Sequence, residues 1–370
     1  MAATPTERSG PRPAALLAAV LLPLVIAAAV LAFAWPAARI APRDLPLGIV
    51  GAGSAGQSAA LALQQAEPGA FDLTLYPDEA AARAAIEDRE VYGALDLSQG
   101  TVTALTASAA GPTVAQLIDQ VAQSVAGRSA AHVAPLKVVT LDVVPTSAQD
   151  PRGLVISSAL LPLTMCGVLV AAVAALLLGL ESAWRQLIGL AVLSAAAGLA
   201  AFLVAQGFLG ALPNQHLETW GVLSLTVFAM SCTVAGLVAL FGTPGLGLGS
   251  ALMVFVGNPF SGATSAPELL PKPVGEIGQL LPPGAGASLL RSTAYFGGHG
   301  PVAHLVVLAA WSLFGLLALV AGHHSFIGHA ARRDQARTQT QTPEHAHVQA
   351  EAGVVVTEEF ERFVSPRQPV

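Results

Sequence analysis

The sequence predicts an α-helical polytopic membrane protein of about six spans, with a small α/β extracytoplasmic domain inserted after the first span. Composition is the first observation: 54% of the 370 residues are hydrophobic, 11% are charged, and the mean hydropathy is +0.63. A soluble domain carries about 25% charged residues. The second observation is a set of uncharged runs that reach the roughly 20 residues of a bilayer-spanning helix. The third is a polar stretch, residues 40–150, in which short strand and helix patterns alternate.

The first apolar run, residues 14–35, predicts the first transmembrane helix after a short cytoplasmic N-terminus, residues 1–13. Arg8 and Arg12 precede the run, as in a secretory signal. The run exceeds the roughly 7–15 apolar residues of a cleaved signal peptide, and the WPAARIAPRD that follows is a poor cleavage site. We therefore expect an uncleaved signal anchor.

The polar stretch predicts a small α/β domain because strand-like and helix-like segments alternate at short spacing. Asp78 is expected to cap the helix that begins after it. The expected strands are 48–50, 71–76, 91–97, 101–106 and 136–144, and the expected helices are 55–65, 78–88 and 111 to about 126.

A glycine motif, Gly51-Ala52-Gly53-Ser54-Ala55-Gly56, lies between the first strand and the first helix of this domain. The pattern G-x-G-x-x-G in this context is the fingerprint of a dinucleotide-binding site. The predicted topology places it outside the cytoplasm, where NAD and FAD are not generally supplied. The acidic ribose ligand expected about 20 residues further on is also missing from the end of the second strand. We expect a tight strand-to-helix turn and no cofactor.

Residues 154–325 predict a five-span membrane domain. The predicted spans are 154–180, 187–209, 220–241, 246–263 and 302–320. The run 246–263 is the weakest, because Gly257-Asn258-Pro259 is expected to break it. Cys166 and Cys232 both lie inside apolar runs, so we expect small packing residues and no disulfide.

The distribution of Lys and Arg near the span ends sets the predicted orientation. The bias is clearest at the C-terminal tail, where Arg332, Arg333 and Arg337 follow the last span. Both termini are therefore expected in the cytoplasm of a multi-pass protein of the cell (plasma) membrane. Residues 326–370 lack apolar periodicity and predict a disordered cytoplasmic tail. Its His345-Ala346-His347 lacks a rigid scaffold, so we expect no metal site there.

Motifs for catalysis are missing from the sequence. It contains no G-x-x-x-x-G-K-[ST] loop, no H-E-x-x-H and no G-x-S-x-G, so we expect neither an enzyme nor catalytic, cofactor-binding or metal-binding residues. No long basic run indicates nucleic acid as a partner. The span cores also lack the acidic and basic residues that ion-coupled pumps place at membrane depth. Transport by this chain would need energy from a partner.

The sequence ESAWRQ, between the second and third spans, is a candidate site for docking a cytoplasmic partner. Glu181 and Arg185 are four residues apart, which suits a short interfacial helix with Trp184 at the level of the lipid headgroups. The alternative is a charged turn that only connects two spans.

Residues 257–300 form the second candidate site, because this segment combines a predicted helix break with several prolines. The residues singled out are Asn258, Pro259, Pro282, Pro283 and Gly284. Broken backbone at membrane depth survives only where it is buried in protein or lines a cavity. The segment is therefore either a re-entrant gate that contacts substrate or a structural outer cap.

Three stretches carry a resemblance to a known family: PDEAAARAAIEDREVYGALDL (77–97), DPRG (150–153) and the stretch 258–296 with its QLLPPGAG. Together with the span order, they resemble the type-two ABC transporter permease superfamily, in particular the actinobacterial type of its YhgE/Pip (phage infection protein-like) branch. The resemblance implies one span, an outer domain and about five further spans. It also implies a separate ATPase subunit that docks on the cytoplasmic loop between the second and third spans.

The expected function is that of a membrane permease subunit of an ABC-type exporter, energised by a separate ATP-binding subunit and working as a homodimer or heterodimer in the lipid bilayer. The alternative is a non-transporting membrane receptor or secretion-scaffold protein that acts through residues 40–150. An oxidoreductase that uses Gly51–Gly56 is the third and weakest hypothesis.

Overall fold

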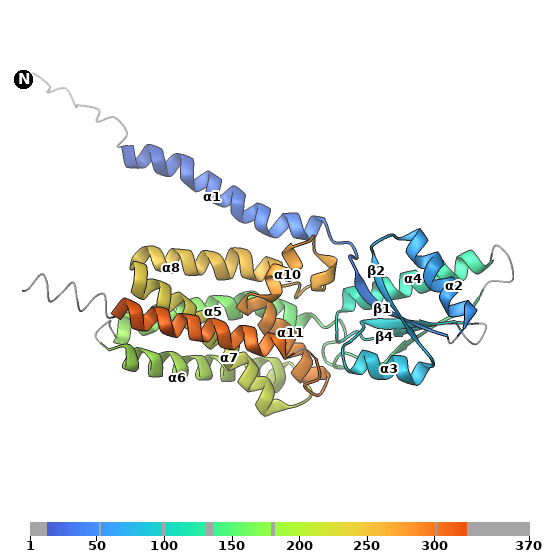
Figure 1. Cartoon of the computed structure of the whole chain (residues 1–370). Helices are drawn as coiled ribbons and strands as arrows, with labels where there is room; N and C mark the ends of the chain where they lie inside the picture. Colours follow the sequence, from blue (N-terminus) through green and yellow to red (C-terminus); the bar gives the residue numbers. More distant parts are fainter. Residues whose placement is uncertain are drawn as a thin grey trace, which may run out of the picture.

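The computed structural model describes residues 13–51, 53–97, 101–130, 136–178, 182–300 and 302–323. A bundle of long helices carries a small α/β domain at one end (Figure 1). Within the described residues, five helices are long and apolar enough to cross a membrane. These are Ala19–Ala38 in α1 (Pro13–Ala38), α5 (Leu154–Leu178), Ala183–Phe208 in α6 (Ala183–Phe202) and η1 (Leu203–Phe208), α7 (His216–Phe241), and the last helix, Ala303–His323.

The α/β domain contains every strand and helix predicted for residues 40–150. Its five-stranded sheet has the order β2-β1-β3-β4-β5 and is mixed, because β1 is parallel to β2 and β3, whereas β4 is antiparallel to β3 and parallel to β5. The elements are β1 (Leu45–Val50), α2 (Ser54–Ala66), β2 (Phe71–Tyr76), α3 (Glu79–Glu87), β3 (Gly93–Asp96), β4 (Val102–Thr106), α4 (Pro112–Ala130) and β5 (Val138–Asp142).

Two local predictions for this domain are confirmed. The side chain of Asp78 accepts a hydrogen bond of 2.8 Å from the backbone N–H of Ala81, so it caps α3. The glycine motif forms a tight turn, in which Gly51 and Gly53 have φ angles of 148° and 157°. A Cβ atom on Gly56 would lie 2.5 Å from the carbonyl oxygen of Gly51, so only glycine fits at this close approach.

The central strands β1, β3 and β4 are buried on both faces of the sheet, and the segment after α9 (Asn258–Phe260) completes each core. On one face, Leu47 and Ile118 of α4 share a cluster with Leu269. On the other, Ile86 of α3 shares a cluster with Phe296. Central strands covered on both sides are rich in apolar residues, as observed here. The domain therefore shares its core with chain that is about 200 residues away in sequence.

Helix α7 is the centre of the bundle, with 67% of its most apolar stretch buried. A Cβ atom on Gly236 of α7 would lie 2.6 Å from the carbonyl oxygen of Gly315 in the last helix. One on Gly198 of α6 would lie 2.3 Å from Oγ of Ser224 in α7. Such small residues let neighbouring helices approach closely in membrane proteins. Cys232 is buried in this bundle as expected, but Cys166 is exposed, because apolar composition alone does not show which face of a helix packs.

The sixth predicted span, 246–263, is not among the five helices that meet the length and hydropathy criteria. It is nevertheless helical, as α8 (Thr243–Ser250), the π-helix η2 (Ala251–Gly257) and α9 follow one another without interruption. The helix does not break before Asn258-Pro259 but ends at Phe260, one residue after Pro259, and so stops short of residue 263. The wider π-helical turns just before Pro259 accommodate its ring, which an ordinary helical turn resists.

Three short elements lie between the bundle and the domain: η3 (Pro267–Leu269), α10 (Val274–Gln279) and α11 (Pro282–Tyr295). Helix α11 packs against α5 and α7, and almost all its residues are buried. Helix α1, in contrast, diverges from the bundle (Figure 1) and touches it near α9, where the rings of Phe33 and Phe255 are 6.5 Å apart.

Candidate functional site

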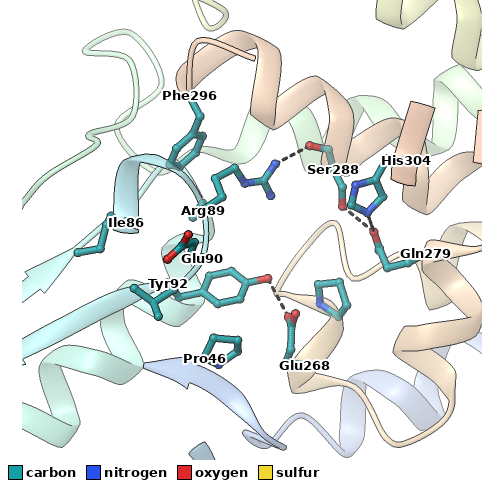
Figure 2. A pocket seen from close by; sticks show the side chains of 13 residues that line it. Pro46, Ile86, Arg89, Glu90, Tyr92, Glu268, Gln279, Ser288, Phe296 and His304 are labelled. Carbon is teal, nitrogen blue, oxygen red and sulfur yellow. Dashed lines mark hydrogen bonds between the residues drawn. The ribbon is translucent and has the colours of Figure 1, made fainter. Parts of the chain in front are cut away.

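A cavity of about 150 Å³ lies where the α/β domain meets the helical part of the chain (Figure 2). The domain contributes Arg89 and Tyr92, which follow α3. The other side is formed by Glu268 of η3 and by side chains from the elements around α11. The residues of that side used below are Gln279, Ser288, Phe296 and His304.

Arg89 is held in an unusual backbone conformation at the edge of this cavity. Its φ of 61° lies in the left-handed region, which non-glycine residues adopt rarely and at a cost of about 1–3 kcal/mol. The side chain donates from Nη1 to the carbonyl oxygen of Ser288 at 2.9 Å, and its guanidinium lies 5.2 Å from the ring centre of Phe296. Burial lowers the pKa of Arg89, and Tyr92 and Glu268 partly oppose this effect. The strained backbone thus directs a cation from the domain onto α11.

Tyr92 and Glu268 make a second link across the junction. The Tyr92 hydroxyl donates a hydrogen bond of 2.7 Å to Oε2 of Glu268 (Figure 2). Burial and the neighbouring carboxylate raise the pKa of Tyr92 well above its ordinary value. The phenol therefore remains a donor at neutral pH.

Gln279 organises the far side of the cavity. Its Nε2 donates to the carbonyl oxygen of Ser261 at 2.7 Å, and its Oε1 accepts from the hydroxyl of Ser288 at 2.7 Å. Nε2 of His304 lies 3.0 Å from the same Oε1, which is an acceptor, so the ring nitrogen is the donor. This network joins α10, α11 and the start of the last helix.

A second arginine, Arg291 of α11, is buried near the cavity and only 5% exposed. It donates from Nη2 to the carbonyl oxygen of Ala263. Burial, and then the charge of Arg89, lowers the pKa of Arg291 to about 10, so it stays protonated at neutral pH. The guanidinium groups of Arg89 and Arg291 both lie near Tyr92, where their charges partly oppose the effect of burial on its pKa. Chemically, these side chains can bind neighbouring groups and hold them in position. Among the described residues, no group of three or more His, Cys, Asp or Glu could hold a metal ion.

Exposed ion pairs surround this junction. Lys272 pairs with Asp44, and Nδ1 of His299 lies 3.0 Å from Oδ1 of Asp88. Arg43, just before β1, donates to the carbonyl oxygen of Leu269 at 2.8 Å. Exposed pairs contribute little stability each. The two parts are therefore held together by the buried contacts of Arg89 with Ser288 and of Tyr92 with Glu268, and by the shared apolar cores.

The predicted docking residues lie at the opposite end of the bundle. Trp184 is 68% exposed and Arg185 is exposed, in the first turn of α6, where Ser182 is the capping residue. Glu181 lies outside the described residues. Whether these residues bind a partner stays a prediction.

The predicted gate or cap residues come together beside the junction. Asn258 and Pro259 end one helix, and Pro282, Pro283 and Gly284 begin α11 and are buried. A Cβ atom on Gly257 would lie 2.8 Å from Cγ of Pro283, and one on Gly284 would lie 2.1 Å from the carbonyl oxygen of Gly278. The segment is thus closely packed, and its role as gate or cap stays a prediction.

Sequence reasoning did not single out the residues that form the cavity. Arg89 and Tyr92 lie in the quoted stretch 77–97 without an assigned role. Arg291 is a lone cation in the apolar SLLRSTAYF, and Glu268 a lone anion in SAPELLP. A single charged residue within an apolar stretch is the sequence signal that indicates such a site, because a buried charge requires a partner.

The fold and the site together define a mostly helical protein with the features of a polytopic membrane protein and a mixed-sheet domain joined to its helices by buried polar contacts. Comparisons with protein-family models, with curated protein sequences and with solved structures found no match.

Proposed function

We propose that this chain is the membrane permease subunit of an ABC-type exporter and that a separate ATP-binding subunit energises it. The observation that carries the proposal is the junction, where Arg89 and Tyr92 of the α/β domain bind Ser288 and Glu268. These contacts couple the position of the domain to that of α11, which packs against α5 and α7. A movement of the helices would therefore change the domain as well. A receptor that acts through its domain alone does not need this coupling.

The arrangement of the chain supports a location of both ends of the helical part on one side of the membrane, which in our proposal is the cytoplasm. The start of α1 and the end of the last helix lie at the end of the bundle remote from the α/β domain (Figure 1). Exposed Trp184 and Arg185 begin α6, at that same end. In the proposed orientation, they face the cytoplasm, where an ATP-binding subunit is available.

The test is affinity purification of the full-length chain from native membranes in mild detergent, followed by mass spectrometry. We expect a nucleotide-binding subunit in stoichiometric amount, and ATP hydrolysis by the complex. The double variant Trp184→Ala, Arg185→Glu is expected to lose that subunit. The control is Phe208→Ala, which removes an aromatic side chain that is 85% exposed at the other end of the same helical run.

Preparations repeatedly free of any ATP-binding subunit contradict the proposal. They would favour the alternative, a receptor or secretion-scaffold protein. In that case, the α/β domain is expected to bind a partner, and substitutions in the helices are expected to leave that binding intact.

A further inference from the structure

A cavity of about 570 Å³ lies among α5, α6, α7 and α11, apart from the junction. Its walls are almost entirely apolar, and Leu154, Leu163, Ala200, Leu223 and Leu290 are representative of them. Pockets of about 300–1,000 Å³ are large enough for a sizeable organic ligand. Its lining comes from the halves of α5 and of α6–η1 near the α/β domain, and both are candidate membrane spans. In a membrane, the cavity would therefore lie in the half of the hydrocarbon core nearer the domain.

Small side chains and an irregular helix leave this space open. Ala159 on α5 and Ala197 and Ala200 on α6 line the cavity where larger residues would fill it. The helix α6 then continues as the π-helix η1, whose Val204 also lines the cavity. π-helical turns of this kind occur frequently at functional sites.

A second cavity, of about 390 Å³, lies on the α/β domain beside the start of α5. Its lining includes Asp119 of α4, Asp142 of β5 and Arg152, and it has hydroxyl groups from several threonines. Leu154, the first residue of α5, lines both cavities. The apolar cavity in the bundle and the polar cavity on the domain therefore adjoin at this residue.

The charges of the polar cavity indicate what it accepts. Asp142 accepts from the backbone N–H of Ser108 at 3.0 Å and from its hydroxyl at 2.5 Å, and Asp119 accepts from Thr140 at 2.8 Å. Each carboxylate offers about four acceptor positions, so capacity is left over for further donors. Arg152 makes no hydrogen bond or ion pair within the part of the chain that the structure describes. Two carboxylates against one guanidinium give the cavity a net negative charge, which disfavours an anionic group. The spare acceptor positions of the carboxylates and the hydroxyls of the threonines suit a group that carries several hydroxyls.

We propose that the two cavities form one binding site for a lipid whose acyl chain lies in the apolar cavity and whose neutral, hydroxyl-bearing headgroup lies against Asp119, Asp142 and Arg152. The apolar walls match a hydrocarbon chain, and the shared Leu154 places the headgroup at the surface of the membrane domain. This binding goes beyond the proposed function and holds whether or not the chain exports anything.

The experiment uses the full-length chain in detergent and native mass spectrometry. Three probes with identical acyl chains are compared: monogalactosyl diacylglycerol, phosphatidylglycerol and phosphatidylethanolamine. We expect the galactolipid to bind with the highest affinity and in a ratio of one lipid to one chain. Equal or tighter binding of either phosphatidylglycerol or phosphatidylethanolamine overturns the proposed headgroup site, and the absence of any retained lipid overturns the whole proposal.

Two substitutions separate the cavities. Ala200→Leu fills the apolar cavity and is expected to weaken all three lipids about tenfold, because a well-packed occupant loses its space. The matched control is Ala196→Leu, at another exposed alanine of α6, which is not part of the lining and is expected to change nothing. Equal effects of the two changes contradict the proposal.

Asp142→Asn tests the headgroup site. It is expected to weaken the galactolipid about tenfold and to reduce its preference over phosphatidylglycerol, because a charge-assisted acceptor is lost. The melting temperature of each variant is measured in the same detergent, so that unfolding is recognised. A folded Asp142→Asn variant with unchanged lipid preference overturns the assignment of the headgroup.

Discussion

Arg89 combines three features that rarely occur together: a left-handed backbone, a buried guanidinium and a partner in a distant part of the chain. The strain in its backbone persists because the contacts with Ser288 and Phe296 compensate for it. Residues of this kind concentrate at functional sites. Arg89 is therefore the residue at which the junction is most sensitive to change.

The variant Arg89→Ala is expected to lower the free energy of unfolding by about 2 kcal/mol, because a hydrogen bond from a charged donor and a cation–π contact are lost. Thermal unfolding in detergent measures this change. Arg83→Ala is the control, since Arg83 only pairs with Glu79 on the surface of α3 at 2.7 Å, and a change within about 0.5 kcal/mol is expected. Equal losses of unfolding free energy for the two variants would show that the contacts of Arg89 stabilise the fold no more than an exposed ion pair does.

The three tyrosines of the chain all resist ionisation. Burial raises the pKa of Tyr76 and, more strongly, that of Tyr92, and burial together with Asp150 raises the pKa of Tyr295 to about 12. In the unfolded chain, a tyrosine ionises near pH 10. A pKa raised in the folded state means that its contribution to stability is complete below about pH 10 and is lost as the pH rises further.

Ultraviolet titration of the folded protein is therefore expected to show phenolate formation at higher pH than in the unfolded chain, which titrates near pH 10. The melting temperature is expected to fall above that pH. Tyr92→Phe is expected to reduce this alkaline loss of stability. A normal tyrosine titration of the folded protein near pH 10 contradicts the burial of these side chains.

At the level of the elements, the prediction from sequence was accurate where local signals agreed. The strand Phe71–Tyr76 was predicted with its observed ends, because it lies between a Pro-Gly pair and a proline. The helix after Asp78 was located by its cap. The mixed sheet and the contacts of residues 257–300 with both domain cores depend on tertiary packing, which no local pattern encodes.

The same reasoning explains why the helix after Thr243 passes Asn258-Pro259 and ends only at Phe260. The proline at position 259 predicted a break because an ordinary helix loses a hydrogen bond and suffers a clash there. The π-helix that removes this conflict has no signature in the sequence. Similarly, the cavity residues Arg89 and Glu268 are 179 residues apart in the chain by their numbers, and only the fold brings them together.

Close packing of α7 against the last helix provides a test at this scale. A Cβ atom on Gly315 would lie 2.3 Å from the backbone carbonyl carbon of Cys232, so Gly315→Ala is expected to destabilise the bundle by about 1–3 kcal/mol. Gly221→Ala in α7 is the control, because nothing lies within 4 Å of the added atom. Thermal unfolding of the two variants in the same detergent measures the difference. Equal melting temperatures would contradict this packing.

For the whole molecule, the proposed orientation makes a direct prediction. In a background where Cys166 and Cys232 are replaced by alanine, Gln123→Cys on α4 is expected to react with a membrane-impermeant maleimide added to intact cells. Arg185→Cys is expected to react only after the membrane is permeabilised, because it belongs to the first turn of α6, which begins at the end of the bundle remote from the domain. The reverse labelling pattern contradicts the orientation with both termini in the cytoplasm.

Helix α1 differs from every other long helix, since only 6% of its most apolar stretch is buried within the described chain. Its aromatic contact with Phe255 and the hydrogen bonds around Arg43 fix only the end near the domain. Packing within the described chain therefore constrains most of this helix only through its length and hydropathy. Sequence drift is expected to be fastest there, and an unrelated apolar helix of equal length is expected to substitute for it without loss of the fold.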